Sequence, residues 1–410
     1  MRDPGESRRA FLGSLGLAGA GVMLAGPVES ARGFAANDTI TVGCLGTGGR
    51  CRTLMKSLAG TPGVRMVAVC DAWDVALAEA RKIADPQAFA TKHYKEVLDR
   101  RDVDAVLIGS PDHWHVPMTV DACAAGKDVY VEKPLTHDLA EGARVIRAQD
   151  ENKRVVQVGL QQRSMPHIRK ARDLIAAGRI GKVFKVALSW NRNTGSRFAR
   201  GPQGVDPKQV AWADFLGAAP DQPFDEYRFR NWRWFWDFGG GLLTDLMVHW
   251  IDVVQWVLNL DHPDKATAIG EHFASEGVWQ TPDTIQCLLA YPGGVQAHFE
   301  GTFSNARNAA RVEFLGTEGT IFIDRGAYVI TPERGRGDVE SMVLGTNPQR
   351  GLDFYDKPDG ERLHLVDWLE AVRSRSKPSC PAEAGVAAAS AAHLGNRAYR
   401  SGQVAGWPGA

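Results

Sequence analysis

The sequence predicts an α/β fold in which a doubly wound parallel sheet is followed by a second, strand-rich domain. Three observations support this prediction. A glycine-rich loop directly follows a short apolar strand, apolar strands then alternate with helical segments up to about residue 160, and tight turns separate several strands later in the chain. Alternating strands and helices form parallel sheets, because each helix carries the chain back to the edge where the next strand begins.

The composition is that of a globular protein without a polyanionic partner. The 410 residues are enough for two domains. The 48 acidic and 48 basic side chains balance, so neither nucleic acid nor an anionic membrane is an expected partner. Six cysteines show no CxxC pair and no metal-ligand spacing, and we expect free, mostly buried thiols. Twelve tryptophans suit either sugar-stacking surfaces or large aromatic cores and subunit interfaces.

Residues 1–35 are expected to be a twin-arginine signal for export to the periplasm or the exterior. Ser7-Arg8-Arg9-Ala10-Phe11-Leu12 precedes an apolar stretch that glycines interrupt and that is too short for a stable membrane helix. Small residues at Gly33-Phe34-Ala35 offer a cleavage point near Ala36. A short amphipathic arm that stays on the protein is the alternative. No other stretch approaches a membrane span in length, so none is expected after export.

The first predicted strand, residues 40–46, leads into a candidate phosphate-binding loop. Gly46-x-Gly48-x-x-Cys51 matches the G-x-G-x-x-G/A pattern except at its last position, which a small cysteine occupies. Gly46 permits a tight turn, and Gly48 lets backbone N–H groups approach a pyrophosphate. A helix that starts near Gly49 directs its positive end at that charge. The neighbouring Arg50 is a further candidate phosphate contact.

An acidic residue follows the second predicted strand, Val64–Cys70. Asp71 lies 23 residues after Gly48, where a carboxylate accepts hydrogen bonds from the adenosine ribose diol and repels a 2′-phosphate. This position favours NAD over NADP as the cofactor. In the alternative interpretation, Asp71 only caps the next predicted helix, Ala72–Ile83.

Further alternation completes the expected nucleotide-binding domain, residues 38–160. The predicted strands are Ala105–Gly109, Asp128–Val131 and Val155–Leu160, and the predicted helices are Pro117–Ala125 and Leu139–Asn152.

The second domain is expected to contain antiparallel hairpins, because Pro292-Gly293-Gly294 and Gly316-Thr317-Glu318-Gly319 form turn signals between apolar runs. The predicted strands are Phe184–Trp190, Ala266–Phe273, Thr284–Ala290, Val295–Thr302, Ala310–Leu315 and Gly319–Ile323. Residues 191–235 are expected to be loops over the site, and 331–360 a lid or an intersubunit arm. Two helices, Leu363–Ser374 and Ala382–Tyr399, are expected to return to the first domain.

Two long motifs connect this chain to a known family. They are VLIGSPDHWHVPMTVDACAAGKDVYVEKPLTHDLAEGARVI, which ends at Ile146, and FGGGLLTDLMVHWIDVVQWVL, which ends at Leu258. With the glycine loop, they make residues 38–402 resemble the Gfo/Idh/MocA oxidoreductases. The resemblance implies a Rossmann domain followed, over residues 161–402, by an α/β domain with a large, open, mostly antiparallel sheet. Its outer face commonly forms a subunit interface, so a homo-oligomer is expected, either a dimer or a tetramer.

The resemblance also implies a catalytic set. Glu132-Lys133-Pro134 matches the family's EKP motif at the carboxyl end of the fifth strand, where such sheets bind ligands. Lys133 can donate to a substrate hydroxyl or carbonyl, and it can relay protons when it is desolvated. Asp245 and His249 match the D-x-x-x-H pattern, and their spacing places both on one helix face. His249 would take the hydroxyl proton as hydride leaves the carbon, while Asp245 would contact the substrate and orient the imidazole. The alternative is a surface lysine, a helix cap and a half-buried histidine.

The residues after the fourth strand, in Pro111-Asp112-His113-Trp114-His115, are expected to contact the cofactor and the substrate. A metal site is not expected, because no third or fourth ligand is spaced to join these histidines. The full set of expected cofactor contacts is Gly46, Gly48, Gly49, Arg50, Asp71, Ser110, Pro111, His115, Glu132 and Lys133.

Substrate contacts are expected from two further segments. Gln161 and Arg163 follow the sixth strand at the same sheet edge and are expected to line the pocket. The run YRFRNWRWFWDFGGG, which contains Trp236, alternates arginine and tryptophan just before the catalytic helix. It suits a sugar-stacking wall, and structural packing explains it equally well.

These features predict an NAD-dependent oxidoreductase that transfers hydride at a hydroxyl carbon of a sugar or cyclitol. The alternative uses the same cofactor for redox-neutral glycoside cleavage, in which transient oxidation acidifies a neighbouring C–H and permits elimination before re-reduction. Some relatives in the family are glycosidases of this kind. A non-catalytic binding protein is a third possibility, against which Lys133, Asp245 and His249 argue. Because no NAD pool exists outside the cytoplasm to reoxidise NADH, export predicts a tightly bound NAD that is regenerated within the site.

Overall fold

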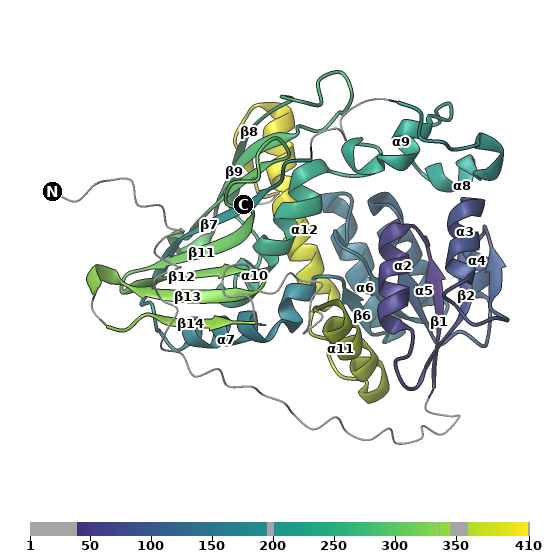
Figure 1. The fold of residues 1–410 in the computed structure, drawn as a ribbon, viewed down its shortest axis with the longest axis horizontal. Helices are drawn as coiled ribbons and strands as arrows, with labels where there is room; N and C mark the ends of the chain where they lie inside the picture. Colours follow the sequence, from purple (N-terminus) through teal and green to yellow (C-terminus); the bar gives the residue numbers. More distant parts are fainter. Residues whose placement is uncertain (1–38, 195–200, 336, 345–359, 409–410) are drawn as a thin grey trace.

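The computed structural model describes residues 39–194, 201–335, 337–344 and 360–408. The expected export signal therefore lies outside the described residues. Two sheets stand at opposite ends of the molecule, and helices fill the space between them (Figure 1). Among the described helices, none is both long and apolar enough to cross a membrane.

The first sheet is parallel and has the strand order β3-β2-β1-β4-β5-β6. Its strands are β1 Ile40–Leu45, β2 Val64–Cys70, β3 Phe89–Thr91, β4 Ala105–Ile108, β5 Asp128–Val131 and β6 Val156–Val158. Helices cover both faces, which is why strands such as AVLI and DVYV are buried along their whole length. The strand order reverses on either side of β1, so a crevice is expected beyond its carboxyl end. The predicted doubly wound sheet is confirmed.

The helices of this sheet are α2 Gly49–Leu58, α3 Asp74–Arg81, α4 Tyr94–Leu98, α5 His115–Ala124 and α6 Gly142–Asn152. Neither β3 nor α4 is among the elements predicted from the sequence. A strand of three residues and a helix of five are too short to establish a hydrophobic period.

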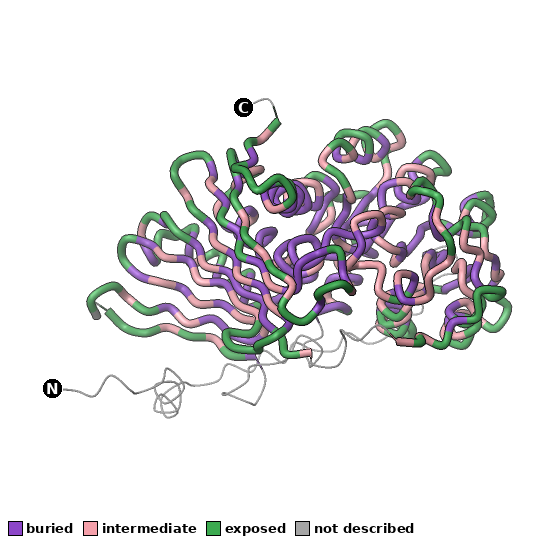
Figure 2. Tube along the Cα trace, turned by 90° about the horizontal axis from the view of Figure 1, so that it is seen from above, coloured by how far each residue is buried: buried purple, intermediate pink, exposed green. Residues whose placement is uncertain are grey.

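The second sheet has the order β14-β13-β12-β11-β7-β10-β9-β8-β15. Among its described pairs, only β7 and β10 run parallel. Burial alternates along its strands, so that one face is covered and the other is exposed (Figure 2). The strands are β7 Val183–Asn191, β8 Lys265–Glu271, β9 Thr284–Ala290, β10 Gln296–Thr302, β11 Ala310–Gly316, β12 Gly319–Asp324, β13 Ala327–Pro332, β14 Glu340–Val343 and β15 Ala405–Gly406. The mostly antiparallel sheet is confirmed, although β14 and the last two residues of β13 lie within 331–360, where a lid or arm was predicted.

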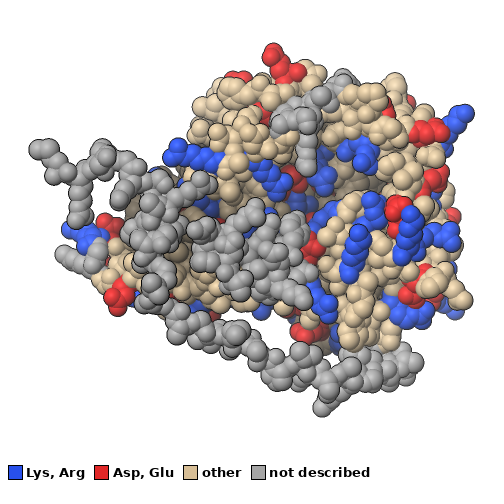
Figure 3. Space-filling model, viewed as in Figure 1, with Lys and Arg blue, Asp and Glu red and all other residues tan. Residues whose placement is uncertain are grey.

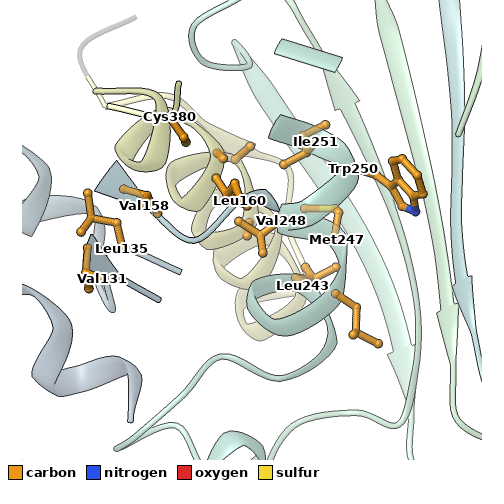
Figure 4. Packing of buried hydrophobic residues seen from close by; sticks show 14 of the residues in the cluster. Val131, Leu135, Val158, Leu160, Leu243, Met247, Val248, Trp250, Ile251 and Cys380 are labelled. Atoms are coloured by element: carbon orange, nitrogen blue, oxygen red, sulfur yellow. The ribbon is translucent and has the colours of Figure 1, made fainter. Parts of the chain in front are cut away.

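Four long helices occupy the middle of the molecule: α7 Pro166–Ala176, α10 Val248–Leu258, α11 Gly360–Ser374 and α12 Ala382–Ser401. Helix α11 packs on α2, where Trp368 joins the apolar cluster that contains Leu54. A second apolar cluster continues from the parallel sheet through α10 toward the second sheet. Figure 4 shows Val131 and Val158 on one side of this cluster and Ile251 and Trp250 on the other, with Leu160 next to Val248 between them. The two sheets therefore share one core.

Residues 201–238 fold over the edge of the parallel sheet as α8 Trp212–Leu216, α9 Glu226–Arg230 and short turns. Aromatic side chains hold this segment together, such as Phe215 against Phe229 and Phe238. Sequence analysis predicted only loops here. The remaining short segments are η2 Asp112–Trp114, η3 Leu139–Glu141, η4 Gln161–Ser164, η6 Pro207–Gln209, η7 Trp232–Trp234, the π-helical η8 Leu243–Met247, η9 Pro292–Gly294 and η10 Glu333–Gly335.

Candidate active site

Two adjoining cavities lie beyond the carboxyl ends of the parallel strands. The first, of about 480 Å³, is lined by the glycine loop, Asp71, Ser110 and Pro111, and we name it the cofactor cleft. The second, of about 380 Å³, is lined by Lys133, His249 and their neighbours, and we name it the catalytic cavity. The residues common to both linings are Arg50, Gly109, Ser110, Arg230, Trp232 and Arg233. A molecule that fills the cleft can therefore present one end to the cavity.

The glycine loop has the shape that a pyrophosphate requires. Gly46 has a φ of +68°, and a Cβ there would lie 2.5 Å from the Ser110 backbone. Gly48 and Gly49 face open space, because a Cβ on either would meet nothing within 4 Å. Helix α2 begins at Gly49 and has no acidic residue in its first turn, so its positive end is available to an anion.

The irregular last position of the motif is explained by packing. A Cβ on Gly109 would lie 2.7 Å from the Cβ of Cys51. Helix α2 and the residue that follows β4 are thus in close contact at Cys51 and Gly109, and a cysteine fits where the pattern has glycine or alanine.

Asp71 lies in the cofactor cleft and does not cap the next helix. Its carboxylate accepts the Trp73 N–H at 2.9 Å and the Thr47 hydroxyl at 3.4 Å, while α3 begins only at Asp74. Burial raises the pKa of Asp71 to about 6. Two buried polar atoms of cleft residues, Ser110 Oγ and Trp73 Nε1, have no hydrogen-bond partner among the described residues. The glycine loop and the N-terminus of α2 fit the pyrophosphate of NAD, and Asp71 fits its adenosine ribose. The unpaired Ser110 Oγ and Trp73 Nε1 are available for further hydrogen bonds to the cofactor.

Lys133 and Asp245 form the charged centre of the catalytic cavity. Lys133 follows β5, and its Nζ donates to Asp245 Oδ1 at 2.7 Å and to the Asp245 carbonyl at 2.9 Å. The Lys133–Pro134 peptide bond is cis. Burial raises the pKa of Asp245, but Lys133 and then Arg233, whose Nε is 3.4 Å away, outweigh it and hold the pKa below its ordinary value.

His249 lies on α10 with its ring against Trp190, at a centroid distance of 5.1 Å. Its Nδ1 is 3.2 Å from Gln162 Oε1. An amide oxygen only accepts, so Nδ1 carries the proton and Nε2 keeps its lone pair. Burial, followed by the charge of Lys133, lowers the pKa of His249 well below its ordinary value. The imidazole is therefore a neutral base at neutral pH.

The structure assigns Asp245 a different contact from the one expected. Its carboxylate binds Lys133, and the described hydrogen bonds connect the His249 imidazole to Gln162 instead. Asp245 lies in the π-helical turn η8, whereas sequence analysis predicted a regular helix. Gln162 was missed, because its only signal in the sequence was its position beside Gln161.

The neighbouring predicted residues form a polar network. Glu132 accepts Arg50 Nε at 2.9 Å and Gln161 Nε2 at 3.2 Å. Arg50 also forms an ion pair with Glu361 of α11, so its guanidinium is held between two carboxylates at the junction of the two cavities. His115 is buried between the carbonyls of Pro134 and Ser110, at 2.6 and 3.0 Å, and burial lowers its pKa to about 4. Most predicted cofactor contacts thus come together.

Two predicted substrate contacts do not line the catalytic cavity. Arg163 forms a buried ion pair with Asp252 of α10, with N–O distances of 2.7 to 3.0 Å, and this pair occupies its guanidinium. Trp236 lines a separate hollow together with Asn396 and Arg400. In their place, Trp190, Trp232, Trp234 and Trp279 line the catalytic cavity. The arginine–tryptophan run is therefore partly cavity wall and partly packing.

The six cysteines are free and buried, as predicted. The described residues contain no cluster of three or more histidine, cysteine or acidic side chains arranged to hold a metal ion.

Comparison with known proteins gives two family matches. Residues 40–160 match the model of an oxidoreductase family with an NAD-binding Rossmann fold. Residues 168–322 match the model of the GFO/IDH/MocA C-terminal domain.

Individual relatives agree with these matches. The chain is 24% identical over 290 residues to an inositol 2-dehydrogenase of Rhizobium meliloti (strain 1021), covering 69% of this chain and 75% of the relative. It is 34% identical over 152 residues to a glycosyl hydrolase family 109 protein of Saccharopolyspora erythraea, covering 31% and 33%. A solved levoglucosan dehydrogenase in complex with NADH superposes with a TM-score of 0.70 at 18% identity, covering 90% of this chain and 99% of that one.

Proposed function

The chain belongs to the Gfo/Idh/MocA family of NAD-binding oxidoreductases, and from this premise we propose that it oxidises a hydroxyl carbon of a sugar or cyclitol with a resident NAD. One observation supports this most strongly. Two segments distant in sequence, the end of β5 and the turn from η8 into α10, bring Lys133, Asp245 and His249 to one cavity, and this cavity shares part of its wall with the cofactor cleft. The cited relatives that act on inositol and levoglucosan support the same substrate class.

Each residue of the catalytic set has a separate role in the proposed oxidation. NAD supplies the hydride acceptor when it is bound in the cleft. His249 Nε2 takes the proton of the substrate hydroxyl. Lys133 donates a hydrogen bond to the same oxygen as it becomes a carbonyl, and Asp245 holds the lysine Nζ in place. The tryptophan rings can cover the apolar face of the sugar and exclude water.

The resident cofactor is proposed from the N-terminal motif. A twin-arginine signal at Ser7–Leu12 would carry a folded protein outward with its NAD already bound. Each oxidation must then be followed by a reduction in the same site, because no external system regenerates the cofactor. Transfer of hydride from one sugar to a second sugar fulfils this requirement.

Redox-neutral glycoside cleavage is the second candidate. The 34% identity to a glycosyl hydrolase family 109 protein favours it, although the match spans about a third of that relative. It requires the same base and lysine, so the two candidates differ in products and not in the residues of the site.

A homo-oligomer through the outer face of the second sheet is part of the proposal. That face carries Ile269, Phe273 and Leu288 with 77%, 72% and 42% of their surface exposed. Neighbouring exposed apolar side chains of this size are typical of a surface that another protein covers.

The test uses the full chain, exported by its own signal and purified without added NAD. We expect the protein to contain near-stoichiometric dinucleotide after desalting and to turn over either paired sugars or an aryl glycoside. A double variant, Arg8→Lys with Arg9→Lys, should remain in the cytoplasm and serves as the control for the export route. Loss of all nucleotide on simple desalting would contradict the resident cofactor. The reaction products would decide between the two candidate reactions.

A further inference from the structure

The described lining of the catalytic cavity carries more basic than acidic side chains. The basic residues are Lys133, Arg50, Arg192, Arg230, Arg233 and Arg325, and the acidic residues are Asp112, Glu132 and Asp245.

All three acids are already neutralised. Glu132 binds Arg50, and Asp245 binds Lys133 and Arg233. Burial raises the pKa of Asp112 well above its ordinary value, so its uncharged form is favoured. Among the described lining residues, Arg192 forms no ion pair with a carboxylate and lies beside largely aromatic walls, and an unpaired guanidinium attracts anions.

The cofactor accounts for only part of this charge. Arg50, Arg230 and Arg233 line both cavities, so a pyrophosphate in the cleft lies within their reach. Arg192 and Arg325 line the catalytic cavity and not the cleft. The cleft has basic residues of its own in Arg52, Lys92 and Lys95. Arg192 is exposed and lies on the substrate side, so its guanidinium is available to a second anion there.

Arg192 and Arg325 converge on one aromatic ring. Arg192 follows strand β7 and Arg325 follows β12, and their guanidinium carbons lie 5.4 and 5.6 Å from the centroid of the Trp190 ring. The same ring lies 5.1 Å from the His249 ring. No carboxylate of the described residues forms an ion pair with Arg192. In the same view as Figure 1, several Lys and Arg side chains lie in the upper half of this face (Figure 3).

We propose that the substrate is an acidic monosaccharide, a single sugar ring that bears a carboxylate or a phosphate, and that Arg192 with Arg325 binds its anionic group. This inference rests on the proposed function and specifies its substrate class. Arginine is suited to the task, because its planar fork pairs with the oxygens of either anion. A cavity of about 380 Å³ is at the small end of ligand sites, which favours one ring over a nucleotide sugar.

An anion at this position would also assist the base. Burial lowers the pKa of His249 most, and the charges of Lys133 and Arg325 lower it further. A bound negative charge offsets those cations and makes the imidazole a stronger proton acceptor. The acidic substrate would thus activate the residue that deprotonates it.

The test measures binding by calorimetry on the NAD-containing protein, so it needs no turnover. The probes are gluco-, galacto- and manno-configured hexuronates, the matching hexose 6-phosphates and the neutral hexoses. We expect at least one acidic sugar to bind about tenfold or more tightly than its neutral counterpart, with an advantage that shrinks as salt is added. Whichever class binds more tightly, the hexuronates or the hexose 6-phosphates, identifies the anionic group of the substrate as a carboxylate or a phosphate.

Variants locate the anion. Arg192→Gln should weaken binding of the preferred acidic sugar about tenfold and change the neutral hexose less than twofold. Arg101→Gln, which removes an exposed arginine outside both cavities, should leave all affinities unchanged. The proposal is wrong if no acidic sugar binds, if neutral sugars bind as tightly, or if Arg192→Gln weakens both classes equally.

Parallel turnover assays separate this inference from the proposed function. Tight binding of an acidic sugar without any reduction of NAD would contradict the oxidation and leave the binding site established. Reduction of NAD by neutral sugars only would contradict the acidic substrate and leave the oxidoreductase established.

Discussion

At the scale of single residues, the reactivity of His249 depends on which ring nitrogen carries its proton. Gln162 Oε1 is 3.2 Å from Nδ1, and its acceptor character places the proton there. Burial keeps the ring neutral by lowering its pKa. Gln162 lines the catalytic cavity and positions the imidazole of His249 through this hydrogen bond.

Two substitutions of Gln162 test this role. Gln162→Leu removes the acceptor and should lower kcat about tenfold or more. Gln162→Glu places a carboxylate beside Nδ1–H, which favours the imidazolium and raises the pKa of His249. Because only the neutral ring acts as a base, the acid limb of the kcat/KM profile should move to higher pH. An unchanged acid limb in a folded Gln162→Glu enzyme would contradict the assignment.

At the scale of elements, the turn from β1 into α2 contains two glycines with different roles, one in folding and one in ligand binding. Gly46 is required by the fold, since its φ is positive and any Cβ would strike the Ser110 backbone. Gly48 has a φ of −59° and open space around its missing Cβ, so the folded chain alone would accept a side chain there. The open space beside Gly48 is therefore needed for ligand binding and not for folding.

The matched pair Gly46→Ala and Gly48→Ala tests this division. Gly46→Ala should lower the free energy of unfolding by about 2 kcal/mol, because it combines strain with a clash. Gly48→Ala should change it by less than about 0.5 kcal/mol, yet it should weaken NAD binding, because the new methyl occupies the approach of the pyrophosphate. Denaturant unfolding and NAD titration measure the two effects. Undiminished NAD affinity in Gly48→Ala would place the pyrophosphate elsewhere.

The elements also explain what the sequence could predict. Strands, the glycine loop and the position of Lys133 follow from local patterns, and these predictions were correct or off by one or two residues. Arg163 was placed in the pocket from its position after β6, but its guanidinium pairs with Asp252, 89 residues later in the chain. The Asp245–Lys133 pair, the π-turn and Gln162 likewise depend on how α10 docks against the parallel sheet. Contacts between distant segments carry no local signal.

At the scale of the whole molecule, buried histidines connect helices to the sheets. His364 of α11 is fully buried, and its Nε2 lies 2.9 Å from the Val158 carbonyl at the end of β6. Burial lowers its pKa to about 4. Between that value and the unfolded pKa of about 6.5, the unfolded state binds the proton and the folded state does not. This contribution to stability is therefore complete above pH 6.5 and is lost as the pH falls toward 4.

The variant His364→Gln isolates this contribution, because glutamine keeps a polar partner for Val158 but cannot take up the proton. We expect the variant to be less stable than the wild type at pH 7.5. The gap should narrow between pH 6.5 and 4.5 by up to about 1.4 kcal/mol per pH unit. Urea unfolding at several pH values measures it. A gap that stays constant or widens on acidification would show that His364 is not held neutral in the fold.

In the proposed reaction, His249 accepts the substrate proton, and NAD bound in the adjoining cleft would supply the hydride acceptor. The most direct measurement is a single-turnover experiment in which NAD-loaded protein is mixed with each of the acidic and neutral sugars named above. The near-ultraviolet absorbance of the reduced dinucleotide reports the reaction. Wild-type protein should show reduction with at least one sugar. His249→Gln should bind the same amount of NAD and reduce it about 10² to 10⁴ times more slowly. Reduction at the wild-type rate by His249→Gln, or no reduction by the wild type with any sugar, would contradict the account.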